Sequence, residues 1–420
     1  WSSDVCSSDL CARPARLLVM TYLLWALPTL AVALAILSGK VKVTHAAVLG
    51  VCVAVPVAYW SGPAQVDLAS AFARGGWIGA TIAPYIFGGL LFWQVAGKAG
   101  PASQNGLPHP PEGMTQNLAA TKRSQRRQLF FACFLVGPFA ESATGFGVGM
   151  LGTMALLGRH GLAPRQLMVF GLLSQTFIPW GAMGSGTMLA SVYARLDPAV
   201  LGLYSVVPVT LLMAVWLPLF WRTAKDAGHA PSKRDALEDI AWLSVAIGLL
   251  AIATWALGPE TALLAAFAPL IVVRYIADNH PSRAALAATA RRTFPFAALI
   301  VCLVGLRLVP GLNGVLSDAL RIQLYSDLPA FSPLKHAGSW MVFGALVTLA
   351  GRRLFSALRP EAIAAWNNGK NAIYTVFLFS IMAEILSASG ISDASAQAVA
   401  HNLSTAAALI SPLVSGGLGD

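Results

Sequence analysis

The stretch LFFACFLVGPFAESATGFGVGMLGTMALL, residues 129–157, limits how the rest of the chain can be arranged. It is apolar enough to enter a membrane, but Gly, Pro, Ser and Glu141 interrupt it near its centre. Non-helical backbone is tolerated at membrane depth only where protein buries it or where it lines water. The stretch therefore predicts a re-entrant hairpin of two short helices rather than one full span.

The composition around this stretch predicts an all-α polytopic membrane protein. The 420 residues are 56% hydrophobic and 11% charged, whereas roughly 25% of a soluble domain is charged. Apolar segments of about 18 or more residues, the length that spans a bilayer, recur along the chain. We expect ten spans, near residues 17–37, 43–60, 77–96, 166–191, 199–221, 240–257, 261–277, 293–310, 339–350 and 371–389. A second broken segment is expected at 397–417.

The charge of +10 is distributed as in a membrane protein. Basic residues gather in short loops between apolar segments, which is typical of positive-inside loops and argues against a nucleic-acid partner. If residues 129–157 enter and leave on one side, most of the 28 Lys and Arg lie on that side, the cytoplasmic one. Arg274 and Arg307 fall near the ends of spans, where we expect the charged groups to reach the membrane surface.

The chain is expected to form a single transmembrane domain over residues 11–420. Residues 1–10, WSSDVCSSDL, repeat an SSD tripeptide and match nothing that follows, so we expect a non-native scar there. At the other end LISPLVSGGLGD stops at Asp420 inside an apolar pattern, which predicts a truncation.

A weak internal repeat predicts inverted topology. The segment Ile86–Gly100, IFGGLLFWQVAGKAG, parallels Val376–Gly390, VFLFSIMAEILSASG, and each precedes a broken segment. The first copy covers about 77–222, and the second begins near 339. The spans before the two broken segments cross in opposite directions, an organisation found in many secondary transporters.

Glu141 is the strongest candidate for a functional residue. A charge at the centre of a membrane helix costs ~2.5 kcal/mol or more and is rare without a task, so we expect Glu141 to couple a proton. A half-helix that starts beside it can direct N–H groups at an anion. The alternative is a packing turn in which Glu141 caps a broken helix. The candidate substrate-binding residues in this hairpin are Ser142, Thr144, Gly145, Phe146 and Gly147.

Two further regions supply candidates. Residues 174–188, SQTFIPWGAMGSGTM, predict an unwound helix with Gly181, Gly184 and Ser185 as substrate-binding residues, or else close helix packing through small side chains. Glu384, aligned with Gln94 in the repeat, is a second candidate for proton coupling. The alternative for Glu384 is a lone acid hydrogen-bonded between helices.

Other chemistry is disfavoured. The seven histidines lack paired-ligand spacing and the five cysteines lack a CxxC pair, so we expect no metal, cofactor or disulfide. The cysteines inside apolar segments, Cys52, Cys133 and Cys302, are expected to be small buried side chains. A membrane-embedded enzyme that uses Glu141 as acid or base is the alternative of another class, but no second carboxylate, His or Cys lies at a motif spacing from it.

The hairpin and its surroundings resemble the L-lactate permease family. The run Phe134–Gly147 ending in ESATGFG, the span before it, the WGAMG turn and the later ASGIS and LISPLVSGGLG occur in that family's order. The chain departs from the family at Ser142–Thr144, where the family has small apolar residues, and at Gly149, near where the family has Pro. The family also continues past the second hairpin.

The resemblance implies a transporter, not an enzyme, in the bacterial cytoplasmic membrane. Members take up L-lactate, D-lactate and glycolate together with protons. The expected partners are thus a small carboxylate, protons and the lipid bilayer. A permease for another small organic anion with sodium coupling is the alternative, and the sequence leaves open whether copies form a homo-oligomer.

Overall fold

The computed structural model describes residues 15–97, 122–145, 147–309 and 311–403. Over these ranges the chain consists of helices joined by turns and loops, with one isolated bridge between Ile322 and Phe331. Within them eight helices are long and apolar enough to cross a membrane, or nine if one bent pair counts as a single span. The composition thus predicts the class correctly, an all-α multi-pass membrane protein. Residues 1–10, Phe146 and the expected second hairpin beyond 403 lie outside the described residues.

The helices form two compact units. The first contains Trp1–Ala83 and Lys370–Asp420, and the second contains Pro84–Gly369. Two long helices, α4 (Leu68–Gly97) and α16 (Leu358–Ala388), contribute residues to both units.

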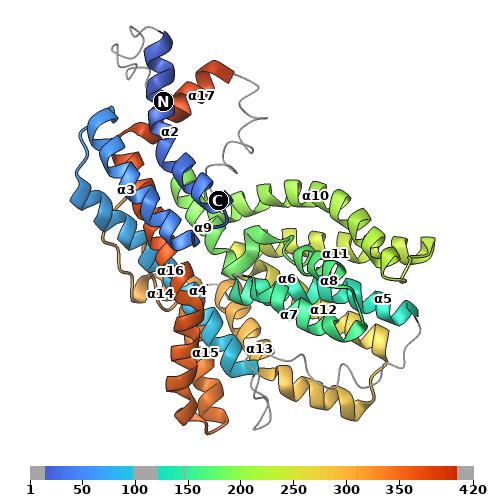
Figure 1. Cartoon of the computed structure of the whole chain (residues 1–420). Coiled ribbons are helices and arrows are strands. Elements are labelled where there is room, and N and C mark those ends of the chain that lie inside the picture. The colour runs from blue at the N-terminus through green and yellow to red at the C-terminus, as the bar shows by residue number, and fades with distance from the viewer. Residues whose placement is uncertain (1–14, 98–121, 146, 310, 404–420) are drawn as a thin grey trace. The chain divides into compact units, whose positions relative to one another are not determined.

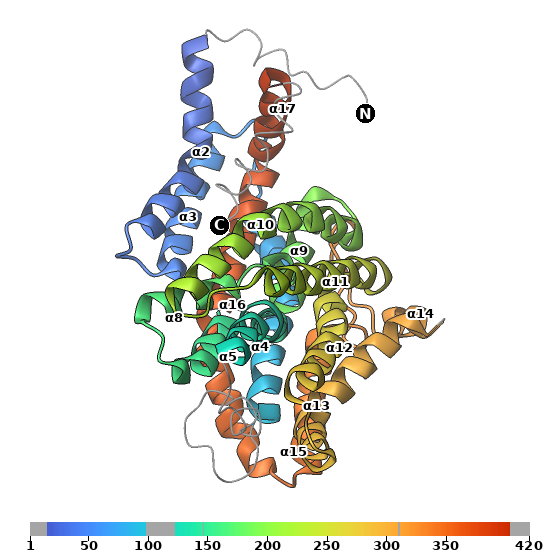
Figure 2. The ribbon, with the colours of Figure 1, turned by 90° about the vertical axis from the view of Figure 1, so that its right-hand side faces the viewer.

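The first unit is held together by close packing of small residues. Its remaining helices are α2 (Ala15–Leu37), α3 (Val43–Ser61) and α17 (Ile391–Leu403), and α2 and α3 lie side by side (Figure 2). A Cβ atom on Gly75 of α4 would lie 2.5 Å from the Cα of Ile381 in α16. Small residues that let helix backbones approach are typical of membrane bundles.

The second unit carries the candidate site. The elements that lie wholly within this unit are α5 (Lys122–Phe131), η3 (Ala132–Val136), α6 (Gly137–Thr144), α7 (Val148–Leu157), η4 (Gly158–His160), α8 (Pro164–Leu173), η5 (Ile178–Trp180), α9 (Gly181–Ala194), α10 (Pro198–Asp226), α11 (Lys233–Leu257), α12 (Pro259–Asn279), α13 (Arg283–Leu308), α14 (Leu312–Ala319), α15 (Ala337–Gly351) and η6 (Phe355–Ala357). The long helices α10, α11 and α12 follow one another as neighbours (Figure 1).

Each predicted span has a helical counterpart, but helix ends often lie outside the apolar segments. The helix α16 begins at Leu358, well before the apolar segment at 371, because polar residues can continue a helix beyond the hydrophobic layer. The segment predicted at 166–191 is broken between α8 and α9. The inverted repeat stays a prediction, since residues 404–417 of its second broken segment lie outside the described residues.

Residues 129–157 fold as the predicted hairpin. The arms are antiparallel: Thr153 Oγ1 donates to the Ala132 carbonyl at 3.3 Å, and a Cβ on Gly149 would clash with the Gly137 carbonyl. A π-helical turn, η3, precedes Pro138, and this wider turn accommodates a residue that lacks an N–H. The turn between the arms uses Gly145 at φ 71° and Gly147 at φ 81°, a conformation that glycine adopts without a steric penalty.

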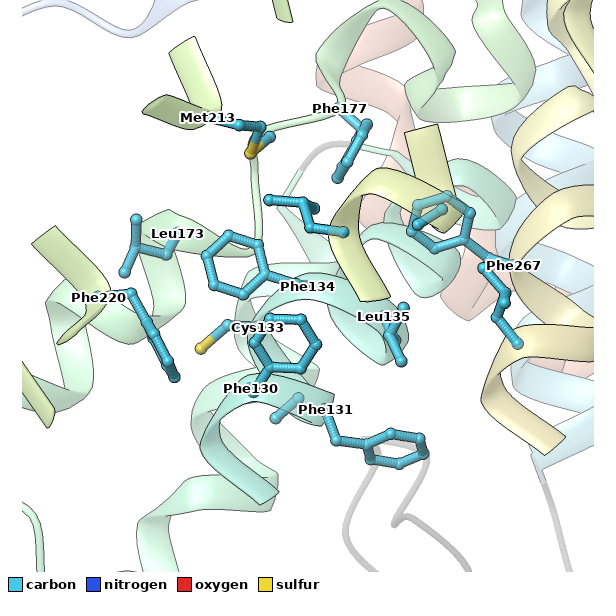
Figure 3. Close-up of a cluster of buried hydrophobic side chains, with 14 of the residues drawn as sticks. Phe130, Phe131, Cys133, Phe134, Leu135, Leu173, Phe177, Met213, Phe220 and Phe267 are labelled. Atoms are coloured by element: carbon cyan, nitrogen blue, oxygen red, sulfur yellow. The ribbon is translucent and has the colours of Figure 1, made fainter. Parts of the chain in front are cut away.

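An aromatic cluster fixes the first arm of the hairpin. Phe134 packs edge-to-face on Phe220 of α10, with ring centroids 5.3 Å apart (Figure 3). Phe170 of α8 packs on the same Phe220 ring. Cys133 lies buried among these rings, as expected for a small apolar side chain. Cys52 and Cys302, by contrast, lie on exposed faces of their helices. The rigid cluster therefore positions the turn at the far end of α6.

Candidate functional site at two broken helices

The second break lies between α8 and α9, which are bent by 63°. After a turn and the short helix η5, three successive residues, Ala182, Met183 and Gly184, have φ of 46°, 57° and 64°. A left-handed conformation costs about 1–2 kcal/mol for a residue with a side chain. Such strain persists only where surrounding structure imposes it, and it is concentrated at functional sites. The predicted unwinding of residues 174–188 is thus confirmed.

The two breaks are in contact. A Cβ on Gly145, at the hairpin turn, would lie 2.5 Å from the Cβ of Ala182. Gln175 bridges the same elements: with its amide oriented to satisfy both ends, it donates to Glu141 Oε2 at 3.3 Å and accepts from the Met150 amide at 3.0 Å. The hairpin and the unwound segment therefore cross.

The junction of α11 and α12 supports the unwound segment from behind. The buried Trp180 donates from Nε1 to Thr254 Oγ1 at 2.9 Å. A Cβ on Gly184 would lie 3.0 Å from the carbonyl of Pro259, the first residue of α12. The position of α12 therefore limits where residues 182–184 can lie.

The helix α4 completes a closed set of contacts. A Cβ on Gly89 would clash with the Ala143 carbonyl at the end of α6. One turn earlier, Tyr85 donates to Glu260 Oε1 at 2.7 Å. We call this set the contact ring. It consists of Tyr85 and Gly89 in α4, Ala143 and Gly145 in the hairpin, Ala182 and Gly184 in the unwound segment, and Pro259 and Glu260 in α12.

Glu141 caps the second arm of the hairpin. Its carboxylate accepts from the amides of Gly147 at 3.0 Å and Gly149 at 2.9 Å, at the start of α7. A carboxylate at a helix N-terminus satisfies free N–H groups and interacts favourably with the helix dipole. The geometry is therefore that of the capping alternative. The Gly145 amide is occupied too, because it donates to the Glu141 carbonyl at 2.7 Å.

The two predicted hydroxyl donors, Ser142 and Thr144, differ in whether the protein already occupies their hydroxyl groups. Thr144 Oγ1 donates to the Ala140 carbonyl at 2.7 Å. Ser142 is 1% exposed, and its Oγ has no hydrogen-bond partner among the described residues. A buried polar atom without a partner costs about 1–3 kcal/mol and calls for an explanation, such as a role in binding. Ser142 is thus the predicted donor that remains available to a ligand.

The other predicted residues lie close to the crossing. Gly181 follows η5, and a Cβ there would lie 3.8 Å from Glu141 Cγ. Ser185 is buried at the point where α9 resumes a right-handed helix. Phe146 lies outside the described residues.

Glu384 is not a lone acid. It belongs to the first unit and forms an ion pair with Arg74 Nε at 2.8 Å. Arg74 lies in α4, ahead of the apolar segment predicted at 77–96. Gln94, which is aligned with Glu384 in the predicted repeat, has a buried Oε1 that accepts no hydrogen bond from the described residues.

A buried ion pair that no sequence pattern indicated, between Arg307 and Glu260, lies beside the contact ring. Arg307 in α13 pairs through Nη2 with Glu260 and donates through Nη1 to the Leu257 carbonyl. Both Arg307 and Arg274 are held in ion pairs, and the expectation that their charged groups reach the membrane surface stays a prediction. Arg274 is 1% exposed and pairs with Glu238 at 2.8 Å and Asp278 at 2.6 Å. No local signal reveals the pair of Arg307 and Glu260, which are 47 residues apart, whereas Arg274 and Asp278 have the i,i+4 spacing of neighbours on one helix face.

A second charged network joins α5 to α11. Arg126 Nη1 lies 2.7 Å from Asp239 Oδ2, and the two side chains are 3% and 1% exposed. Trp221 Nε1 donates to the same oxygen at 2.9 Å. Part of the basic cluster assigned to a cytoplasmic loop is therefore buried and anchors the helix that leads into the hairpin.

The fold defines the class of the protein, a polytopic α-helical membrane protein with a hairpin and an unwound helix in contact. None of the protein families, characterised proteins or solved structures compared with the chain matches it. What the chain does must therefore be argued from the site itself.

Proposed function

We propose that the protein is a secondary transporter that takes up L-lactate and related small hydroxy-monocarboxylates, such as D-lactate and glycolate, together with protons. The membrane would be the bacterial cytoplasmic membrane. The sequence resemblance to the L-lactate permease family suggests this substrate class, and the observation that carries the proposal is the hydrogen-bonded carboxylate of Glu141 where two broken helices cross.

Broken helices that are buried against protein support a transport role. Discontinuous helices in membrane transporters commonly form the substrate site, because they expose backbone and polar groups at membrane depth. Here an ionisable group, Glu141, and a buried hydroxyl without a partner among the described residues, that of Ser142, are consecutive residues of α6 just before the hairpin turn. A hydroxy-monocarboxylate requires hydrogen-bond partners, and proton symport requires a group that takes up a proton.

Glu141 is placed to couple proton binding to the shape of the hairpin. As a carboxylate it accepts charge-assisted hydrogen bonds, which are stronger than neutral ones, from the amides of the N-cap residue Gly147 and of Gly149 in the first turn of α7. Protonation removes the charge and weakens both bonds. Uptake of a proton therefore loosens the N-terminus of α7 beside the contact ring.

Glu141→Gln tests this proposal. We expect cells or proteoliposomes with this variant to lose the uncoupler-sensitive accumulation of labelled L-lactate, because the amide cannot exchange a proton. Exchange of labelled for unlabelled lactate should persist, since the amide oxygen can still cap α7. Assays with glycolate, acetate and succinate, with and without sodium, define the substrate and the coupling ion.

Glu384→Gln is the matched control for the second candidate. Its ion pair with Arg74 predicts a structural role, so accumulation should depend on pH as in the wild type. Accumulation by Glu141→Gln with a wild-type pH dependence would leave Glu141 as a helix cap only. Absence of lactate, glycolate and acetate uptake by the wild type would contradict the proposed substrate class.

A further inference from the structure

We propose that Arg307 binds the carboxylate of the transported anion, and that Glu260 is an internal carboxylate which the substrate displaces from it. This inference rests on the proposed function and names the charged residue of the same site. It concerns a pair that no sequence motif indicated.

The site needs a positive charge that the hairpin does not supply. A monocarboxylate that enters a protein within the membrane must exchange its hydration for a counter-charge or for N–H donors. The amides at the start of α7 are bound to Glu141, and Ser142 is neutral. None of the residues of the contact ring is cationic, and Arg307 reaches the ring through its bond to Glu260.

The geometry around Arg307 suits exchange of one carboxylate for another. Glu260 is held on one oxygen by Arg307 and on the other by the Tyr85 hydroxyl at 2.7 Å. The planar guanidinium presents paired N–H groups that match a carboxylate. The side chains of Arg307 and Glu260 are each 11% exposed, so the surrounding protein covers most but not all of the pair.

The position of the pair also suits a hydroxy-carboxylate. Tyr85 lies one helical turn, about 5 Å, from Gly89, and Gly89 contacts Ala143, the residue next to Ser142. The guanidinium of Arg307 thus reaches the contact ring through Glu260, and Ser142 adjoins the ring at Ala143. A small hydroxy-carboxylate carries one charge for Arg307 and one hydroxyl for Ser142.

The energetics favour a functional role for the pair. Replacing a buried ion pair by apolar residues is often neutral or stabilising, so stability alone does not explain one within a span. Ionisable residues in membrane spans commonly mark substrate pathways. When the substrate replaces Glu260, Arg307 keeps a carboxylate partner and is never left unpaired.

Equilibrium binding of labelled L-lactate to the purified full chain in detergent tests the inference, with uptake into proteoliposomes measured in parallel. In Glu260→Gln/Arg307→Gln both charges are absent, so no unpaired charge remains to disrupt folding. We expect the Kd for L-lactate to rise at least about tenfold, the effect of losing one charge-assisted hydrogen-bonded contact. Preference for lactate over uncharged lactamide should disappear.

Two further variants complete the test. Glu260→Gln alone removes the competing carboxylate, and we expect it to lower the Kd for L-lactate. The control Arg126→Gln/Asp239→Asn neutralises another buried pair of the same unit and should bind lactate as the wild type does. If Glu260→Gln/Arg307→Gln does not fold, an unchanged or raised Kd in Glu260→Gln overturns the inference.

The two proposals fail in different ways. Uptake with a wild-type KM by Glu260→Gln/Arg307→Gln would overturn the role of Arg307 and leave the transport function standing. Lactate binding that depends on Arg307, without uptake by the wild type, would support the binding residue and contradict transport.

Discussion

The hairpin turn meets the unwound segment at Gly145 and Ala182, where a Cβ on Gly145 would lie 2.5 Å from the Cβ of Ala182. Gly145 also has φ 71°, so a side chain there would be strained by its backbone as well as by this contact. The crossing of the two broken helices therefore requires a residue without a side chain at position 145.

Gly145→Ala should destabilise the protein by about 2–4 kcal/mol, the combined effect of left-handed strain and overpacking. The control is Gly152→Ala in α7, where a Cβ would meet no atom within 4 Å. That change should be neutral or stabilise by up to about 1 kcal/mol, because alanine favours a helix over glycine. Thermal unfolding in detergent measures both. Equal stability of the two variants would contradict the crossing.

The Arg126–Asp239 pair predicts a large difference between single and double variants. Asp239→Asn should lower stability by about 3–5 kcal/mol, because it leaves Arg126 buried beside a neutral side chain. Arg126→Gln/Asp239→Asn should recover much of this loss, since no unpaired charge remains. Unfolding in denaturant compares them. A double variant as unstable as the sum of both single ones would show that the two residues act independently.

The pKa of His160 predicts acid sensitivity at the end of the hairpin. Burial, and the charge of His229, lower this pKa from the ordinary value of 6.5. The folded protein then binds a proton at His160 less readily than the unfolded chain does. Stability is therefore fully present above about pH 6.5 and falls as the pH drops below it.

His160→Gln, which can retain a hydrogen bond to Gln128, removes this titration. We expect its melting temperature to fall less than that of the wild type between pH 7.5 and 5.5, values that lie roughly one unit either side of an ordinary His pKa. Parallel pH profiles for the two proteins would show that His160 does not contribute.

The antiparallel arms of the hairpin predict that both of its ends lie on one side of the membrane. Cysteines introduced one at a time at Ser124 and Ala163, in a background where Cys6, Cys11, Cys52 and Cys302 are replaced and only the buried Cys133 is kept, test this. The positive-inside rule places both on the cytoplasmic side. An impermeant maleimide added to intact cells should label neither until the membrane is permeabilised. Labelling of one alone would rule out a re-entrant hairpin.

The sequence alone determined the class of fold and the positions of the breaks. Membrane spans can be predicted because hydropathy is a local property, summed over about 20 residues. The turn at Gly145 and Gly147 and the unwound segment at Ala182–Gly184 are also local, since glycine and proline change backbone preferences where they stand. Glu141 could likewise be predicted as a buried acid beside a break, because the apolar residues and the glycines that indicate this are its neighbours in the sequence.

Only the tertiary structure decided what each charged group does. A carboxylate such as that of Glu141 can bind a proton, a cation or the free amides of a helix end. Folding of the hairpin brought it to the amides of Gly147 and Gly149. Arg307 and Glu260 are 47 residues apart, and Arg74 and Glu384 are 310 apart. An ion pair depends on distance in space, and no local pattern encodes which of several charges will meet when helices pack.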